Sequence, residues 1–328
     1  MEKGYSSHWY STISSTCGRL KHRSTTDADV ALTHLIRAEW VKNLTTSTLA
    51  FDIAQFFPSL NNHLLPLILA KARFDCKVSN FFRNHLVGRK TKYLWNNFSS
   101  PFCNVDVGAS QGLAFSPILS ALYLFPLFYI LEKQLKNLRI PISILSFVDD
   151  GLFISQHKSI SISNVNLFCN YNVISSLLTE FRLVVEHGKT KIFHFSRLHS
   201  VLNPPSLDFT SLGGRVLLPK LTWWYLGFYF DQKFLFCPYI DFYINKAIST
   251  IKYIKMLSSL LKGLAPIQKR YLYICCLLSL VLYGFQLWYY NKAPLDCLLH
   301  TLRKMQWRIA LKKYKKYFLR IKLIRFTN

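Results

Sequence analysis

Residues 144–155 read ILSFVDDGLFIS, two apolar arms rich in β-branched and aromatic side chains around Asp149-Asp150-Gly151. Asp-Gly pairs favour the tight turns of β-hairpins. The stretch therefore predicts an antiparallel hairpin that carries two carboxylates, Asp149 and Asp150, at its tip. Because Asp-Asp-Gly is also an ordinary exposed turn, the surrounding sequence has to decide between a structural and a chemical role.

A third carboxylate follows another apolar stretch. Residues 47–57, STLAFDIAQFF, predict a short strand that delivers Asp52 into a hydrophobic setting. Two adjacent strands can bring Asp52 beside Asp149 and Asp150, and such neighbours repel one another unless a cation offsets their charge. Carboxylate oxygens suit Mg²⁺, and two such ions about 3.5–4 Å apart can activate an attacking hydroxyl and stabilise a leaving oxygen in phosphoryl transfer.

The chain is strongly basic and rich in apolar residues. Its 41 Lys and Arg against 16 Asp and Glu give a formal charge of +25, which repels itself unless a polyanion neutralises it. Nucleic acid is the expected partner. If roughly 6–10 cations meet phosphates, affinity should fall on the order of a thousandfold between about 50 and 200 mM salt. The 51% hydrophobic content excludes a disordered chain.

Helical patterns surround the predicted strands. Residues 27–43 predict a helix that Thr25, Thr26 or Asp27 can cap. Residues 60–102 show helical patterns with interspersed cations, which either contact a phosphate backbone or form a solvated face. The last 32 residues contain no acid and carry cations on every helical face, which predicts a tail or a phosphate-contacting helix. Further strands are expected at residues 181–187, 191–196 and 223–231, and helices after residue 232.

Five segments, in order, resemble the successive palm motifs of reverse transcriptases. They are FDIAQFFPSL from Phe51, GASQGLAFSPILSALYL from Gly108, FVDD from Phe147, EHGKTKIFHFS from Glu186 and YLGFYFD from Tyr225. The likeness runs from about residue 23 to about residue 310 and is closest to the enzymes of non-LTR (LINE-type) retrotransposons, particularly those of fungi. It implies an α+β fold, a right-hand polymerase palm made of an antiparallel sheet with helices, with partial fingers and a helical thumb. The implied activity is DNA synthesis on an RNA template.

The resemblance also implies a catalytic centre. Asp52 and Asp149 would bind both metal ions, two Mg²⁺ with Mn²⁺ as an alternative, and Asp150 would be a weaker ligand. Lys189 matches the lysine near the nucleotide phosphates, where it is placed to protonate the pyrophosphate leaving group. A solvated lysine beside a glycine turn is the competing interpretation. The implied partners are an RNA template, a DNA primer and deoxynucleoside triphosphates.

Other matched positions would contact nucleotide or primer. Phe57 falls where the family blocks a ribose 2′-hydroxyl, although a core aromatic explains it equally well. Gln111 and Gly112 would lie under the incoming nucleotide and the template base, Gly112 because a side chain there would obstruct close approach. The primer-grip position, whose aromatic side chains can equally serve packing, corresponds to Tyr225, Leu226 and Gly227.

The same comparison divides the chain into four parts. They are a degenerate N-terminal segment with a remnant of the fingers (1–46), a palm (47–232) with a fingers insertion at about 60–107, a helical thumb-like region (233–302) and a basic tail (303–328). Complete elements of this family have an endonuclease and basic fingers strands before the polymerase, and no segment of this sequence matches them. We therefore expect a truncated retroelement fragment. A catalytically inactive remnant that still binds nucleic acid is the alternative.

Two apolar stretches, residues 113–131 and 271–290, raise a third alternative, a small membrane protein, because each approaches the ~20 residues that span a bilayer. Prolines and serines interrupt the first stretch, and Gly284 and Gln286 the second. The N-terminus lacks the apolar core of a secretory signal. The eight cysteines form no C-x-x-C pair, and Cys275 and Cys276 are expected as buried, reduced thiols. We expect an intracellular protein, nuclear or cytoplasmic, with no membrane partner.

Overall fold

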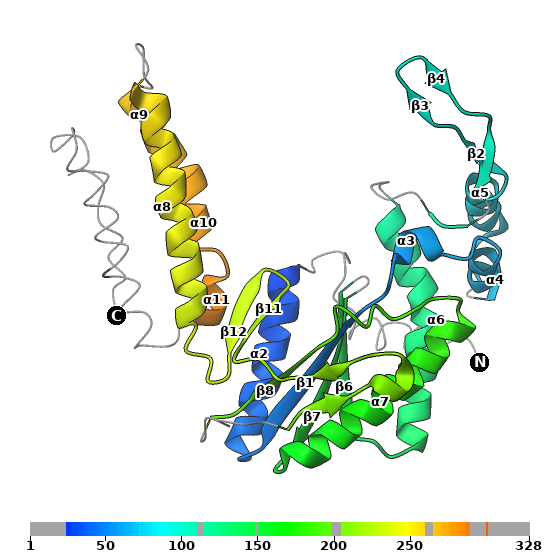
Figure 1. Ribbon diagram of the computed structural model, residues 1–328, viewed down its shortest axis with the longest axis horizontal. Helices are drawn as coiled ribbons and strands as arrows, with labels where there is room; N and C mark the ends of the chain where they lie inside the picture. The colour runs from blue at the N-terminus through cyan, green and yellow to red at the C-terminus, as the bar shows by residue number, and fades with distance from the viewer. Residues whose placement is uncertain are drawn as a thin grey trace. The chain divides into compact units, whose positions relative to one another are not determined.

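The computed structural model describes residues 24–71, 73–105, 107–109, 115–147, 150–197, 205–259, 265–288 and 300. The chain forms two compact units, Met1–Leu221 and Thr222–Asn328. Figure 1 shows a mixed sheet-and-helix unit and a second unit made of a hairpin and helices. The boundary between the two units falls inside the range predicted for the palm, so the hairpin after residue 221 groups with the helices that follow it. The four-part division of the chain remains a prediction.

A four-stranded antiparallel sheet in the order β6-β7-β1-β8 forms the centre of the first unit. The predicted hairpin at residues 144–155 is confirmed as β6 and β7. Phe147 pairs with Asp150, so Asp150 and Gly151 lie inside β7 and not at the tip as predicted. The strands are β1 (Thr45–Asp52), β6 (Ile142–Phe147), β7 (Asp150–His157) and β8 (Lys191–Phe195).

Helices cover both faces of this sheet. Side chains alternate between the faces along each strand, and Phe51 of β1 joins Phe153 of β7 in a core that includes buried residues of α6 (Ser116–Asn137) and α7 (Ile160–Glu180). Helix α2 (Thr25–Val41) contacts β1 and β6. Its buried Leu32 and Ile36 lie outside that core, so α2 covers the opposite face.

Helix α2 begins earlier than the sequence pattern predicted. Ser24 is the N-cap: its Oγ accepts a hydrogen bond from the backbone N–H of Asp27 at 3.3 Å, and the Asp27 carboxylate accepts one from the backbone N–H of Ser24 at 2.7 Å. This is the reciprocal capping box. The predicted caps Thr25, Thr26 and Asp27 therefore lie within the first turn, and Asp27 caps from the N3 position.

The helical prediction for residues 60–102 is only half right. It holds for α4 and α5 and is wrong from Arg89 onward, where the chain forms a β-hairpin. Gly88, with φ of +71°, follows the end of α5, and Asn96, with φ of +49°, lies in the two-residue turn between β3 and β4. The elements here are α3 (Phe56–Ser59), α4 (Leu64–Lys71), α5 (Cys76–Leu86), β2 (Arg89–Thr91), β3 (Leu94–Trp95), β4 (Phe98–Ser99) and β5 (Cys103–Val105).

The strand predicted at residues 191–196 is confirmed as β8, whereas the one at 181–187 is wrong. In that segment only Val185 forms a bridge, with Ile53, and Arg182 takes a φ of +57° that a strand does not allow. Short elements complete the described part of this unit: β9 (Leu207–Asp208), η1 (Thr210–Leu212) and β10 (Val216–Leu217).

The second unit confirms the strand pair predicted at residues 223–231 and the helices predicted after it. Its core is aromatic: the Phe228 ring stacks on Tyr239 at 5.4 Å and on Tyr283 at 5.0 Å between centroids. The elements are β11 (Thr222–Tyr225), β12 (Phe228–Asp231), α8 (Cys237–Ser259), α9 (Pro266–Leu272), the π-helix η2 (Tyr273–Leu278), α10 (Ser279–Val281) and α11 (Phe285–Trp288).

Cys275 and Cys276 are exposed and free, so the prediction that they are buried is wrong. They lie in η2, where Tyr273 and Leu277, four residues apart, occupy the buried face. The cysteines fall between these two positions and point elsewhere.

One helical span, Ile118–Asn137, is long and apolar enough to cross a membrane by length and composition. A core helix of a soluble protein passes the same test, and Leu119, Tyr123 and Leu127 of this span belong to the core of the first unit. Among the described residues, the later apolar stretch holds only the shorter helical segment Arg270–Val281. The span is therefore weak evidence for a membrane protein.

A buried histidine makes the stability of the first unit sensitive to acid. His194 in β8 is 1% exposed; its Nδ1 lies 2.8 Å from Ser47 Oγ, and its Nε2 has no hydrogen-bond partner among the described residues. Burial lowers the pKa of His194 from 6.5 to about 4. Between these values the unfolded chain binds a proton that the folded chain does not, so stability falls as the pH drops through this window.

We expect the His194→Gln variant to lose this acid sensitivity because glutamine stays neutral. The native chain should lose up to about 3 kcal/mol between pH 6.5 and 4 from this group alone. Urea unfolding curves at several pH values measure the difference between the two proteins. Parallel pH profiles would show that His194 does not titrate in this way.

Candidate active site

Two of the three predicted carboxylates meet at one end of the central sheet. Asp52 is the last residue of β1, and it pairs directly with Asp150, the first residue of β7. Residues directly opposite in an antiparallel pair have Cβ atoms about 4.5–5.5 Å apart on the same face. The carboxylates of Asp52 and Asp150 therefore share one face of the sheet. Asp149 precedes Asp150 in the sequence and lies outside the described residues.

Aromatic packing fixes the register that brings these aspartates together. Phe51 pairs with Gly151, and its ring stacks on Phe153 with 4.9 Å between centroids. Phe51 is 3% exposed. A slip of one residue would turn Phe51 out of the core and Asp52 into it, which the burial cost of a carboxylate opposes.

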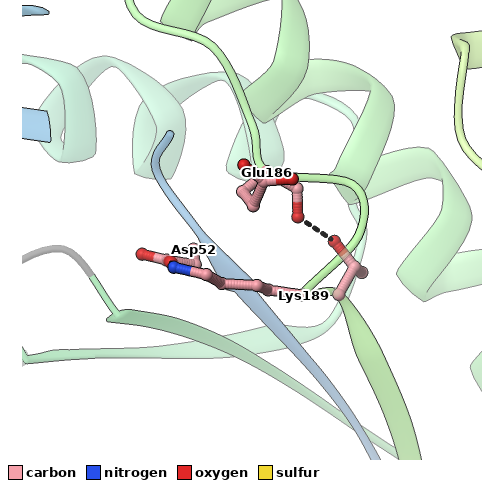
Figure 2. A network of polar contacts seen from close by, with 4 residues as sticks. Asp52, Glu186 and Lys189 are labelled. Carbon is pink, nitrogen blue, oxygen red and sulfur yellow. Dashed lines mark hydrogen bonds and ion pairs between the residues drawn. The ribbon is translucent and has the colours of Figure 1, made fainter. Parts of the chain in front are cut away.

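Lys189 contacts Asp52 directly. Its Nζ lies 2.6 Å from Asp52 Oδ2, and Figure 2 shows the lysine side chain running from its turn toward the aspartate. The Asp52 side chain is 13% exposed and that of Lys189 is 67% exposed. The ammonium group thus offsets the charge of a largely covered carboxylate from the solvent side, where a phosphate or a metal ion could also approach.

Backbone hydrogen bonds tie the turn that carries Lys189 to the end of β1. The N–H of Glu186 donates to the Asp52 carbonyl at 2.8 Å, and the N–H of Lys189 donates to the Glu186 carbonyl at 3.0 Å. The Thr190 hydroxyl donates to the same Glu186 carbonyl at 3.3 Å. These bonds place Lys189 beside Asp52, although 137 residues separate them in sequence.

The turn that carries Lys189 is also held by side chains that no sequence motif indicated. The Tyr171 hydroxyl lies 2.6 Å from His187 Nδ1 and 3.4 Å from Thr190 Oγ1, and burial raises the pKa of Tyr171. Arg215 donates to the Gly188 carbonyl at 2.9 Å. No local pattern predicts these contacts because Tyr171 comes from α7 and Arg215 from the segment before β10.

Gln111 and Gly112 lie outside the described residues, but the segment just before them is fixed. The N–H of Gly108 donates to the Leu60 carbonyl and that of Ala109 to the Phe57 carbonyl, both at 2.7 Å. Gly108 has a φ of +84°, and a Cβ added there would lie 2.5 Å from the Pro58 carbonyl oxygen. A side chain at residue 108 would therefore push apart the two segments that lead to Phe57 and Gln111.

The burial of Phe57 is intermediate between that of a core aromatic and that of an exposed residue. Phe56 is the fully packed aromatic here, at 2% exposure, and Phe57 contacts it edge to face with 5.3 Å between centroids. Phe57 is half-buried and borders the core. Its contact with the core supports a packing role, and exclusion of a 2′-hydroxyl stays a prediction.

The predicted primer-grip residues lie in the second unit. Leu226 and Gly227, with φ of +45° and +98°, form the turn between β11 and β12. Tyr225 is 6% exposed and stacks on Trp223 with 4.6 Å between centroids. The Gly227 carbonyl accepts a hydrogen bond from the Tyr243 hydroxyl at 3.0 Å. Tyr225 thus has a packing role within this unit, and its predicted contact with a primer stays a prediction.

The donor atoms at the sheet end have the chemistry that Mg²⁺ prefers. Within the described ranges no three His, Cys, Asp or Glu side chains gather into a metal site, and the predicted set includes Asp149, which lies outside them. Asp52 and Asp150 supply carboxylate oxygens on one face. Mg²⁺ commonly binds through one or two carboxylates together with phosphates and water, so these residues fit the ion.

Several telomerases are among the solved structures to which this chain is similar. The chain matches telomerase from Candida albicans in complex with a TWJ fragment of telomeric RNA, with 10% identity and a TM-score of 0.50, over 92% of this chain and 54% of that one. Apo telomerase from Candida tropicalis gives 12% identity and a TM-score of 0.47, over 92% and 57% of the two chains. A C-terminally truncated apo form from the same species gives 15% and 0.45, over 60% and 39%. The chain thus spans about half the length, or less, of these proteins.

The sequence itself matches a known family. No curated protein matches the chain. Residues 12–230, well over half of the chain, match the family described as reverse transcriptase (RNA-dependent DNA polymerase). The predicted α+β polymerase palm is confirmed by this match, by the antiparallel sheet with its helices, and by the fold shared with the Candida albicans enzyme. The chain belongs to the reverse transcriptase (RNA-dependent DNA polymerase) family.

Proposed function

We propose that this chain is an RNA-directed DNA polymerase that joins nucleotides by a two-metal mechanism, and that it derives from a non-LTR retrotransposon of the fungal type. The observation that carries the mechanism is the sheet end, where Asp52 lies opposite Asp150 and Lys189 contacts Asp52 at 2.6 Å. Carboxylates and a cation at one place are what transfer of a phosphoryl group requires.

Each residue of this centre has a distinct task in the proposal. Asp52, Asp149 and Asp150 would hold two Mg²⁺ or Mn²⁺ ions, which activate the primer hydroxyl and neutralise charge on the phosphates. Lys189, which is exposed and tethered through its turn, would move from Asp52 to the phosphates of an incoming nucleotide and give a proton to the departing pyrophosphate.

Nucleic acid and nucleotides are the proposed partners. Phe57, Gln111 and Gly112 would border the deoxynucleoside triphosphate and the RNA template, and the turn Leu226-Gly227 with Tyr225 would hold the DNA primer. The formal charge of +25 supports a polyanionic partner. We further propose an intracellular setting, nuclear or cytoplasmic, in which the exposed thiols of Cys275 and Cys276 would stay reduced.

A second candidate is a protein that binds nucleic acid without catalysis. The observation in its favour is the same contact between Lys189 and Asp52. A carboxylate already neutralised by an ammonium group at 2.6 Å attracts a metal ion less strongly, and the basic surface would act alone.

Primer extension on an RNA template distinguishes the two candidates. We expect incorporation with Mg²⁺ or Mn²⁺, complete loss with a chelator, and recovery when the metal is restored. RNA binding, measured separately, should weaken on the order of a thousandfold between about 50 and 200 mM salt. Salt-sensitive binding without extension in either metal would favour the second candidate, and a flat salt response would contradict both.

A further inference from the structure

The hairpin formed by residues 89–105, here named the aromatic hairpin, presents large rings to solvent. Tyr93, Trp95 and Phe98 are 69%, 77% and 63% exposed, and Phe102 is 67% exposed. Trp95 and Phe98 form no ring contact with another described residue. Exposed aromatic residues in such a group mark an interaction surface, since burial would otherwise be favourable.

Strand pairing gathers three of these rings on one face. Trp95 pairs with Phe98, and Leu94 pairs with Ser99. The next pair is Tyr93 with Ser100, where the N–H of Ser100 donates to the Tyr93 carbonyl at 2.9 Å and the Ser100 hydroxyl accepts from the Tyr93 N–H at 2.8 Å. Because side chains alternate along a strand, Tyr93, Trp95 and Phe98 share one face and Leu94 lies on the other.

The charge of this region favours a polyanion. Residues 76–105 contain no Asp or Glu, whereas Lys90 and Lys92 are exposed on the aromatic hairpin itself. Lys92 Nζ lies 5.5 Å from the centre of the Phe102 ring. Cations interleaved with exposed rings are the combination with which proteins bind single-stranded nucleic acid, since rings stack on bases and cations meet phosphates.

We propose that the aromatic hairpin is a second nucleic-acid site, which binds single-stranded RNA or DNA by stacking bases on Tyr93, Trp95 and Phe98. Lys90 and Lys92 contact the phosphates. Every base has a π-face, so binding is tolerant of sequence and disfavours duplexes, whose bases are already stacked. The site needs neither metal nor turnover, and it goes beyond the proposed polymerase centre. Figure 1 shows the hairpin extending beyond α4 and α5, away from β1 and β7.

The base of the hairpin is anchored independently of its tip. Arg89 donates to the Leu86 carbonyl and the Val107 carbonyl, both at 3.1 Å, and to the Gly108 carbonyl. Strands β2 and β5 continue this attachment. Because the tip side chains contribute nothing to the core, substitutions there leave the fold intact and report on binding.

The test compares two substitutions at Trp95. Trp95→Phe keeps a ring and Trp95→Leu keeps only apolar bulk. Fluorescence anisotropy with a labelled oligouridine of about 12 nucleotides, in the presence of EDTA, measures affinity without polymerisation. We expect Trp95→Leu to bind roughly tenfold more weakly, since one stacked base contributes about this factor, and Trp95→Phe to stay within about twofold of the native chain.

Leu94→Ala is the matched control, because Leu94 is 66% exposed on the opposite face of the same hairpin. Its affinity for oligouridine should equal that of the native chain. Duplex RNA should bind all variants alike. Thermal melts confirm that each variant is folded.

Three results would overturn the proposal. Unchanged oligouridine binding by Trp95→Leu would remove stacking as its basis. Dimers of the native chain that dissociate in Trp95→Leu, seen by light scattering, would assign the rings to a contact between copies. Sedimentation with anionic lipid vesicles that is lost in Trp95→Leu, without a change in RNA binding, would assign them to a membrane surface. Failure of primer extension alone affects only the proposed polymerase.

Discussion

Asp52→Asn is expected to lower primer extension by about a thousandfold or more while leaving RNA binding unchanged. Stabilisation of transition-state charge by a bound metal contributes several kcal/mol, and each ~1.4 kcal/mol corresponds to a factor of ten in rate. Asparagine keeps the size of the side chain at the end of β1 but removes the charge that contacts Lys189 and that, in the proposal, would hold a metal ion. Single-turnover extension assays and filter binding of RNA separate the two effects.

The exposed carboxylate of Glu180, at the end of α7, gives a matched control. Glu180→Gln removes the same charge from the same unit and should extend primers normally. Asp149→Ala should be as severe as Asp52→Asn, and Asp150→Asn milder, since Asp150 is the weaker ligand in the proposal. Extension that survives Asp149→Ala would remove the assignment of this centre.

Local patterns predicted the parts of the fold that depend on neighbours in sequence. The two apolar arms on either side of Asp149-Asp150 form β6 and β7, as the Asp-Gly turn signal between them predicted. The apolar run before Asp52 forms β1. The turn itself was misplaced by one residue because Gly151 suggested a tip position. Gly151 instead leaves room for the Phe51 ring on the neighbouring strand, a contact that no local sequence pattern predicts.

Elements stabilised mainly by tertiary packing were missed. Helix α7 has no side-chain cap, and Ser and Asn residues are spread along it, so its pattern is weak. It forms because Leu167, Ile174 and Leu178 pack in the core beside the sheet. The support of Lys189 by Tyr171, His187 and Arg215 was invisible for the same reason, since each contact joins residues far apart in sequence. The resemblance predicted Lys189 near the nucleotide phosphates and not its contact with Asp52, which the hydrogen bonds of the turn at Glu186 explain.

Gly151→Ala is expected to destabilise the first unit by about 3 kcal/mol, at the upper end for overpacking of a core. A Cβ at residue 151 would overlap the Phe51 ring. That ring also stacks on Phe153 and is 3% exposed, so it has no space into which to turn. Because Phe51 also fixes the register that aligns Asp52 with Asp150, folded Gly151→Ala protein should be impaired in primer extension as well.

Gly188→Ala and a double-mutant cycle test this steric cause. At Gly188 the nearest atom to an added Cβ is Glu186 Oε1 at 3.2 Å, the end of a flexible side chain, so Gly188→Ala should change the unfolding free energy by less than about 0.5 kcal/mol. Phe51→Leu gives the alanine at residue 151 more room. The double variant should therefore be more stable than the sum of the two single losses predicts, by about 1 kcal/mol or more in urea unfolding. Strict additivity would mean that the loss at Gly151 arises from the backbone and not from the Phe51 ring.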